Sequence, residues 1–299
     1  MKKLVVGLGE VLWDILPGRK YLGGAPANFA YMTNLMGDHG IVASRVGTDA
    51  RGLEAMRRIE VLGLTVEAVQ RDGSYPTGAV NVHVDDRGMA RFEIEEPSAW
   101  DFLEWTPEWH TLAQKADAVC FGSLAQRAAE SRNSIRRFVR ATRPAAVRVF
   151  DVNLRPPFYS QSVLEESMKL ADIVKLNDDE VPKVMELGNL AHIDEKSSAK
   201  RLIDLYDLKL VCITRGSRGS LLVSPSDASE QAGFAVRVAD TIGAGDAFTA
   251  ALVHEYLREA TLDRMNHVAN LVGAWVASES GPTPTPKDGA LERSLAEIV

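Results

Sequence analysis

The chain has 299 residues, of which 45% are hydrophobic and 25% are charged, ordinary values for a globular protein with room for one large domain. Its net charge of −7 argues against a sequence-independent grip on nucleic acid or on an anionic membrane surface. No stretch approaches the roughly 18 apolar residues of a membrane span, and Glu10 and Asp14 interrupt the N-terminal apolar run too soon for a signal peptide.

Short apolar runs alternate with amphipathic helical patterns along the chain. In order, the pattern predicts a strand at 4–8, a helix at 28–36, a strand at 41–46, a helix at 52–62, and strands at 118–121, 147–152, 173–176 and 210–213. Strands that alternate with helices predict parallel βαβ units. We therefore expect an α/β fold with a doubly wound, mostly parallel sheet flanked by helices.

The region 77–96 departs from this alternation. Residues 77–84 alternate in polarity, 85–88 have turn composition, and 89–94 are again strand-like, which predicts a β-hairpin. We interpret the hairpin, together with residues 11–22, as a lid on a single domain that spans 1–299. An edge hairpin with no functional motion is the alternative.

Two cysteines, Cys120 and Cys212, each lie within a strand-like apolar run. This setting is typical of buried thiols in core strands rather than of catalysis or a disulfide. Unpaired thiols suit a reducing compartment, so we expect a cytoplasmic protein.

The C-terminal third predicts helices at 244–257 and 262–278, after which a run rich in proline ends regular structure near 281–286. An extended apolar segment, 234–238, leads toward the first of these helices. After this segment the chain runs through Asp240-Thr241-Ile242-Gly243-Ala244-Gly245-Asp246 into the helix predicted at 244–257. Because the first turn of a helix leaves its N–H donors unpaired, this glycine turn can bind an anion such as a phosphate.

The carboxylate of Asp246 repels a phosphate, so it is unexpected in a turn whose only function is to bind one. We interpret it as a general base, which takes the proton of a hydroxyl that attacks the phosphate. An ordinary glycine turn with an aspartate that caps a helix is the alternative. The Walker pattern is missing its Lys-Ser/Thr pair, and bulky Phe248 and Leu12 stand where a dinucleotide fingerprint needs a small third residue.

Other polar clusters follow predicted strands. They are Asp14, Gly23-Gly24 with Asn28, Asp151 to Arg155, Asn177 to Glu180, and Thr214 to Gly219. Ligands of open parallel sheets bind outside the carboxyl ends of the strands, so these clusters predict one binding cleft.

In this order, Gly23-Gly24…Asn28, Asn177-x-x-Glu180, Thr214-x-Gly216-x-x-Gly219 and the motif that ends in Asp246 resemble the ribokinase (phosphofructokinase-B type) sugar kinases. The resemblance runs from about residue 4 to about 282. The segment Asp151-Val152-Asn153-Leu154-Arg155 is most similar to fructokinases, although 2-keto-3-deoxygluconate kinases share much of it.

The resemblance implies an ATP-dependent kinase whose base is Asp246 and whose γ-phosphate site is formed by the N–H groups of Ala244, Gly245 and Asp246 in the turn that begins at Gly243. The positions that match sugar-binding residues are Asp14, Gly23, Gly24, Asn28 and, as an anion or sugar contact, Arg155. Those that match the nucleotide site are Asn177, Thr214, Gly216 and Gly219.

The resemblance also implies metal ions. Glu180 would act on Mg²⁺ through water, and Asp240 with the carbonyl of Ile242 would bind K⁺ together with groups near 278–281. Lid hairpins carry dimer contacts in many members, which implies a homodimer through 77–96. Nothing in the resemblance implies a nucleic-acid or membrane partner.

We therefore expect phosphorylation of a primary hydroxyl, with D-fructose favoured and fructose 6-phosphate as the product. Alternatives are a 2-keto-3-deoxygluconate kinase, another sugar kinase of the family, and, less favoured, a nucleoside kinase or a nicotinamide oxidoreductase. A catalytically silent sugar sensor belongs to another class of function. The presence of Gly245, Asp246 and Glu180 together argues against a sensor.

Overall fold

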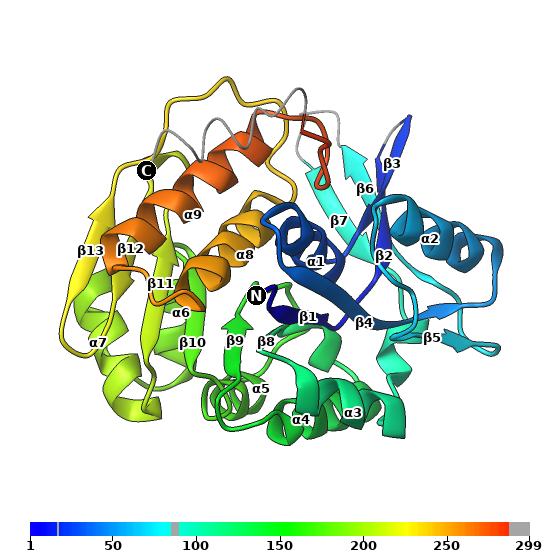
Figure 1. The fold of residues 1–299 in the computed structure, drawn as a ribbon, viewed down its shortest axis with the longest axis horizontal. Coiled ribbons are helices and arrows are strands. Elements are labelled where there is room, and N and C mark those ends of the chain that lie inside the picture. Colours follow the sequence, from blue (N-terminus) through cyan, green and yellow to red (C-terminus); the bar gives the residue numbers. More distant parts are fainter. Residues whose placement is uncertain (17, 85–89, 287–299) are drawn as a thin grey trace.

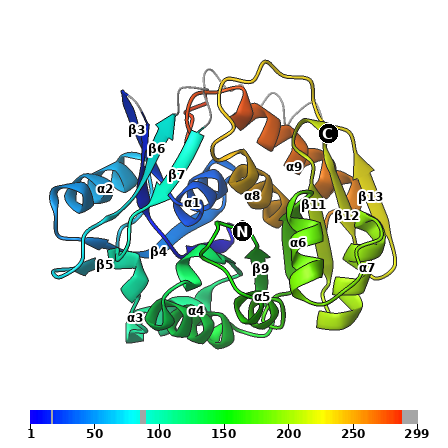
Figure 2. The same cartoon turned by 180° about the vertical axis from the view of Figure 1, so that it is seen from behind.

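The computed structural model describes residues 1–16, 18–84 and 90–286. In these ranges it confirms the predicted α/β fold. Figures 1 and 2 show a large twisted sheet with helices on both faces and a smaller sheet beside it. None of the helices in the described ranges is long and apolar enough to cross a membrane.

The larger sheet has nine strands in the order β13-β12-β11-β10-β9-β8-β1-β4-β5. Neighbours from β5 to β11 are parallel, and β12 and β13 continue the sheet antiparallel. The strands are β1 (Leu4–Leu8), β4 (His39–Gly47), β5 (Val69–Asp72), β8 (Ala118–Gly122), β9 (Val147–Asp151), β10 (Ile173–Asn177), β11 (Leu210–Thr214), β12 (Ser220–Val223) and β13 (Ala228–Gln231). The carboxyl ends of the parallel strands therefore meet along one edge.

Helices cover both faces of this sheet, so its central strands are buried on two sides. Val5 of β1 packs in one hydrophobic core and its neighbour Val6 in the other. The first core is covered by α1 (Ala25–Leu35), α2 (Ala50–Val61), α8 (Ala244–Tyr256) and α9 (Leu262–Ala277). The second is covered by α3 (Pro107–Lys115), α4 (Ala129–Ala141), α5 (Gln161–Met168), α6 (Glu180–Leu187) and α7 (Glu195–Tyr206).

Both cysteines lie where the sequence predicts them. Cys120 on β8 and Cys212 on β11 are buried and unpaired. Loss of solvation raises the pKa of each thiol above its ordinary value. They are core residues, as expected.

The smaller sheet has four strands in the order β3-β2-β6-β7. They are β2 (Leu12–Leu16), β3 (Arg19–Gly23), β6 (Gly78–Val84) and β7 (Ala90–Ile94). The predicted hairpin corresponds to β6 and β7, whose predicted turn at 85–88 lies outside the described residues. β2 pairs with β6 in parallel, so the hairpin is one half of a sheet whose other half comes from residues 12–23.

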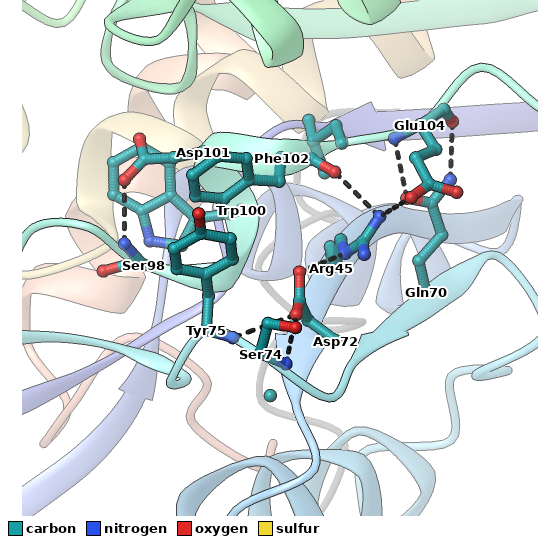
Figure 3. Close-up of polar contacts among 12 residues, drawn as sticks. Arg45, Gln70, Asp72, Ser74, Tyr75, Ser98, Trp100, Asp101, Phe102 and Glu104 are labelled. Atoms are coloured by element: carbon teal, nitrogen blue, oxygen red, sulfur yellow. Dashed lines mark hydrogen bonds and ion pairs between the residues drawn. The ribbon is translucent and has the colours of Figure 1, made fainter.

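The connection between the two sheets is held by a polar cluster around Asp72, shown in Figure 3. Its Oδ1 accepts the backbone N–H groups of Ser74 (2.7 Å) and Tyr75 (2.9 Å), and its Oδ2 pairs with Arg45 Nε at 2.8 Å. The Tyr75 ring stacks on Phe102 with a centroid distance of 3.7 Å. Together these contacts fix the chain between β5 and β6, just before the chain enters the smaller sheet for the second time.

The start of the first helix differs from the prediction. Helix α1 begins at Ala25 instead of residue 28, because Gly24 takes a left-handed φ of 99° and Pro26 fits the first helical turn. Asn28 therefore lies within the helix. The segment 234–238 belongs to no sheet, and its Val236 and Val238 side chains are 40% and 57% exposed.

Candidate functional site

A cleft of about 2010 Å³ opens at the carboxyl edge of the larger sheet and is walled on one side by residues of the smaller sheet. Residues from distant parts of the chain line it. Among them are many of the predicted site residues, namely Asp14, Gly24, Asn28, Arg155, Ile242, Gly243, Gly245 and Asp246. The structure thus brings the predicted sugar and phosphate positions into one space.

Asp246 lies in the first turn of α8, partly buried in the cleft. Asn28 Nδ2 of α1 donates to Asp246 Oδ2 at 2.8 Å and so orients the carboxylate. Loss of solvation and the nearby Asp151 raise the pKa of Asp246 to about 7, against the lowering effects of Asn28, Lys175 and Arg155. A carboxylate with this pKa can accept a proton near neutral pH.

The turn before Asp246 has a backbone that glycine permits. Gly243 is the N-cap residue of α8 with φ 80°, and a Cβ there would lie 2.7 Å from Pro282 Cα. The Ala244 N–H donates weakly to the Thr241 carbonyl at 3.3 Å. As first-turn donors, the N–H groups of Gly245 and Asp246 have no partner within the helix, so these are the amides available to an anion.

The predicted sugar residues lie between α1 and the smaller sheet. Asp14 is on β2, and a Cβ on Gly23 would come within 2.1 Å of its Oδ2, so only glycine leaves room for this carboxylate. Loss of solvation raises the pKa of Asp14 to about 6, while Arg155 opposes the rise. Asn28 Oδ1 is buried without a hydrogen-bond partner among the described residues, which leaves an acceptor for a ligand hydroxyl.

The predicted nucleotide residues lie at the next strand ends and do not line this cleft as it stands. Asn177 ends β10 beside Thr214 of β11, with which it is in register. Gly216 and Gly219 follow with φ 57° and 96°, conformations that favour glycine. A site for a long ligand would therefore extend along the sheet edge from Asp246 toward β11.

Glu180, the first residue of α6, links the segments that follow β9 and β10 through hydrogen bonds to their backbone. Its Oε1 accepts the Leu154 N–H at 2.6 Å and its Oε2 accepts the Asn177 N–H at 2.8 Å, while Asn177 Oδ1 accepts the Glu180 N–H at 2.9 Å. The described residues contain no group of three or more His, Cys, Asp or Glu side chains that could hold a metal. Because backbone N–H groups hold both carboxylate oxygens of this buried side chain, a metal ion would meet Glu180 through water.

Asp240 and Ile242, predicted to bind a monovalent cation, belong to one tight turn. Asp240 Oδ1 accepts the Ile242 N–H at 3.0 Å, and the Ala239 N–H donates to the Ala277 carbonyl at 2.9 Å. The turn thus lies against the end of α9, next to the predicted partner segment 278–281. The Asp240 carboxylate and the Ile242 carbonyl are oxygen donors, the type of ligand that hard cations take.

Two charged residues of the cleft escaped the sequence analysis as site residues. Glu10, after β1, is 5% exposed, and loss of solvation raises its pKa to about 7. Lys175, on β10, is 7% exposed and lines the cleft beside Gly245 and Asp246. The available signal was a lysine in the middle of an apolar strand, which is rare unless the charge is paired.

Comparison with known proteins bears on the family and the fold. Residues 15–288 match the pfkB family carbohydrate kinase profile. The fructokinase of Escherichia coli is 31% identical over 261 residues, which cover 82% of this chain and 82% of the relative.

Two solved structures share the fold over almost the whole chain. A sugar kinase from Pyrococcus horikoshii in complex with ATP is 27% identical, with a TM-score of 0.81 and coverage of 99% of this chain and 100% of that chain. A double mutant of the fructokinase from Vibrio cholerae O395, with fructose, ADP and potassium ion bound, is 25% identical, with a TM-score of 0.83 and coverage of 99% and 98%.

Proposed function

The chain belongs to the pfkB family of carbohydrate kinases, and we propose that it transfers the γ-phosphate of ATP to a primary hydroxyl of a neutral sugar, with D-fructose the favoured acceptor. One observation carries the proposal: Asp246 stands in the cleft at the N-terminus of α8, held by Asn28, beside amides that suit a phosphate. The fructokinase relatives at modest identity add loose support for fructose.

In the proposed reaction, Asp246 accepts the proton of the sugar hydroxyl as that oxygen forms a bond to the γ-phosphorus. The bond from the γ-phosphorus to the bridging oxygen breaks, and its electron pair leaves with ADP. The first-turn amides of α8 bind the equatorial phosphate oxygens, and Asn28 keeps the carboxylate aligned. Mg²⁺, when bound with the nucleotide near Glu180, would neutralise phosphate charge.

The charges of the cleft favour a neutral acceptor over a sugar acid. Its described lining has the acidic side chains of Glu10, Asp14, Glu93, Glu95, Glu96 and Asp246, whereas its described cations are Arg155 and Lys175. Lys175 is already paired with Asp151 at 3.1 Å. A substrate carboxylate would thus have Arg155 as its cation and several like charges around it.

The smaller sheet supplies one wall of the cleft through Leu12, Asp14, Leu16 and Val80. We propose that it acts as the lid over the sugar, since closure would exclude water from the reacting hydroxyl. Its attachment through the fixed Asp72 cluster gives the sheet a firm base at residues 72–78.

The experiment that tests the function measures ADP release with fructose, 2-keto-3-deoxygluconate, ribose, adenosine and tagatose. We expect fructose to give the highest kcat/KM. A higher kcat/KM with 2-keto-3-deoxygluconate would replace the neutral-sugar assignment with the sugar-acid kinase. Sugar binding without ADP release from any acceptor would favour the sensor.

We also propose that K⁺ binds at Asp240 and the Ile242 carbonyl and strengthens the adjacent phosphate site. Replacement of K⁺ by tetramethylammonium at constant ionic strength is then expected to lower kcat, because the larger ion cannot enter the turn. The measurement is the rate of ADP release with saturating substrates. Equal rates in the two salts would rule out the cation site.

A further inference from the structure

The side chain of Lys175 places a positive charge next to the first turn of α8. Its Nζ lies 3.1 Å from Asp151 Oδ1 and 3.2 Å from Asp151 Oδ2, on the neighbouring strand, where the two residues are in register. The same Nζ would lie 3.2 Å from a Cβ on Gly245. The ammonium is therefore next to the backbone of the phosphate turn.

Thr249 ties this ion pair to α8. Its Oγ1 lies 2.9 Å from Asp151 Oδ2 on β9 and 3.0 Å from the carbonyl oxygen of Gly245, one helical turn earlier, so its single proton is shared between these two acceptors. Thr249 is fully buried and Asp151 is 4% exposed. The position of the ammonium is thus set by the sheet and by the helix that carries Asp246.

The charges around Lys175 keep it protonated. Burial alone would lower the pKa of its ammonium, but Asp151, Glu180 and Asp246 outweigh burial and hold the pKa above its usual range. In return, Lys175 lowers the pKa of Asp246, whereas Asp151 raises it. The other titratable or charged groups that face Asp246 are Arg155, Glu10 and Cys120.

We propose that Lys175 is a positioning residue for phosphoryl transfer: held by Asp151 and Thr249, its ammonium keeps Asp246 ionised and adds positive charge under the turn that receives the phosphoryl group. This inference rests on the proposed function, because it needs Asp246 as the base. A buried ion pair is costly to desolvate, and packing alone would be served as well by apolar side chains. The proposed role gives a functional reason for the pair of Lys175 and Asp151.

The test compares pH profiles of kcat/KM for Lys175→Met and Asp151→Asn. We expect Lys175→Met to lower kcat at pH 7 by roughly 100-fold with little change in either KM, about the cost of displacing a reacting group by 1 Å. The acid limb of the Lys175→Met profile moves to higher pH, because the pKa of Asp246 rises when the nearby cation is removed. The acid limb of Asp151→Asn moves to lower pH, because Asp246 loses a neighbouring anion. A merely structural role would not shift the two limbs in opposite directions.

Lys209→Met is the control, since Lys209, just before β11, pairs at 2.8 Å with Asp172, just before β10, at the ends of these strands away from the cleft. It should leave the profile unchanged. If Lys175→Met fails to fold, Asp151→Asn with Lys175→Met removes both buried charges, and we expect a folded protein with kcat still reduced. An unshifted acid limb in Lys175→Met, or wild-type kcat in the double variant, would overturn the inference. The proposed base fails separately, if Asp246→Asn stays active.

Discussion

Replacement of Asp246 by asparagine is expected to lower kcat between about 10²- and 10⁴-fold, the usual contribution of a general base. Asparagine has nearly the same shape and can keep a hydrogen bond to Asn28, so the KM values for sugar and ATP should change little. Wild-type kcat/KM is expected to rise with pH through about 7, the pKa to which loss of solvation raises Asp246. The residual activity of Asp246→Asn should lack this rise.

Glu255→Gln serves as the control, because Glu255 is a buried acid in the last turn of α8 that pairs with Arg264 far from the cleft. Unfolding of Asp246→Asn gives a second readout. The folded pKa of Asp246 is raised, so the carboxyl contributes stability at low pH that is lost as pH rises through about 7. Asp246→Asn should therefore gain stability over wild type as pH rises from 4 to 8. Near-wild-type turnover would show that Asp246 is not the base.

Gly243→Ala is expected to reduce both activity and stability. A methyl group at this position would lie 2.7 Å from Cα and Cβ of Pro282, on a backbone with φ 80°. The turn must shift, and a displacement of about 1 Å at a reacting group costs on the order of 100-fold in rate. The strained backbone and the contact with Pro282 together should lower the free energy of unfolding by about 2–3 kcal/mol.

Gly63→Ala separates the two causes of this loss. Gly63 has φ 75°, yet nothing lies within 4 Å of the Cβ that alanine would add. This variant should lose about 1 kcal/mol from the unfavourable φ and keep full activity. Steady-state kinetics and denaturant unfolding of both variants measure the difference. Equal kinetics for the two would mean that the Pro282 contact does not set the phosphate turn.

Much of the fold follows from local sequence signals. The strand predicted at 4–8 is β1 with the same bounds, and the helix predicted at 244–257 is α8 within one residue at its end. These elements have strong apolar patterns and clear starts, so neighbours along the chain determine them. The segment 234–238 has apolar composition too, yet the structure gives it no regular element, so composition alone does not determine whether a segment joins a sheet.

Only some of the charged and polar residues of the cleft could be predicted, because local sequence signals mark some of them and not others. Asp246 and Asn28 stand in motifs that can be identified along the chain, and the structure places them in contact. Lys175 and Glu10 become informative only through neighbours across the sheet. Lys175 faces Asp151 because β9 and β10 pair in one register, and a single sequence does not specify that register.

The contact between Asn28 and Asp246 joins positions 218 residues apart, and other contacts bridge similar distances. Arg258 of the segment after α8 pairs with Asp38 over 220 positions, and the Tyr31 hydroxyl donates to the Pro284 carbonyl over 253. During synthesis, α1 therefore leaves the ribosome long before the helix that covers it. The early part of the chain is left with apolar surface exposed, and Asn28 meets the proposed base only after another 218 residues have been synthesised.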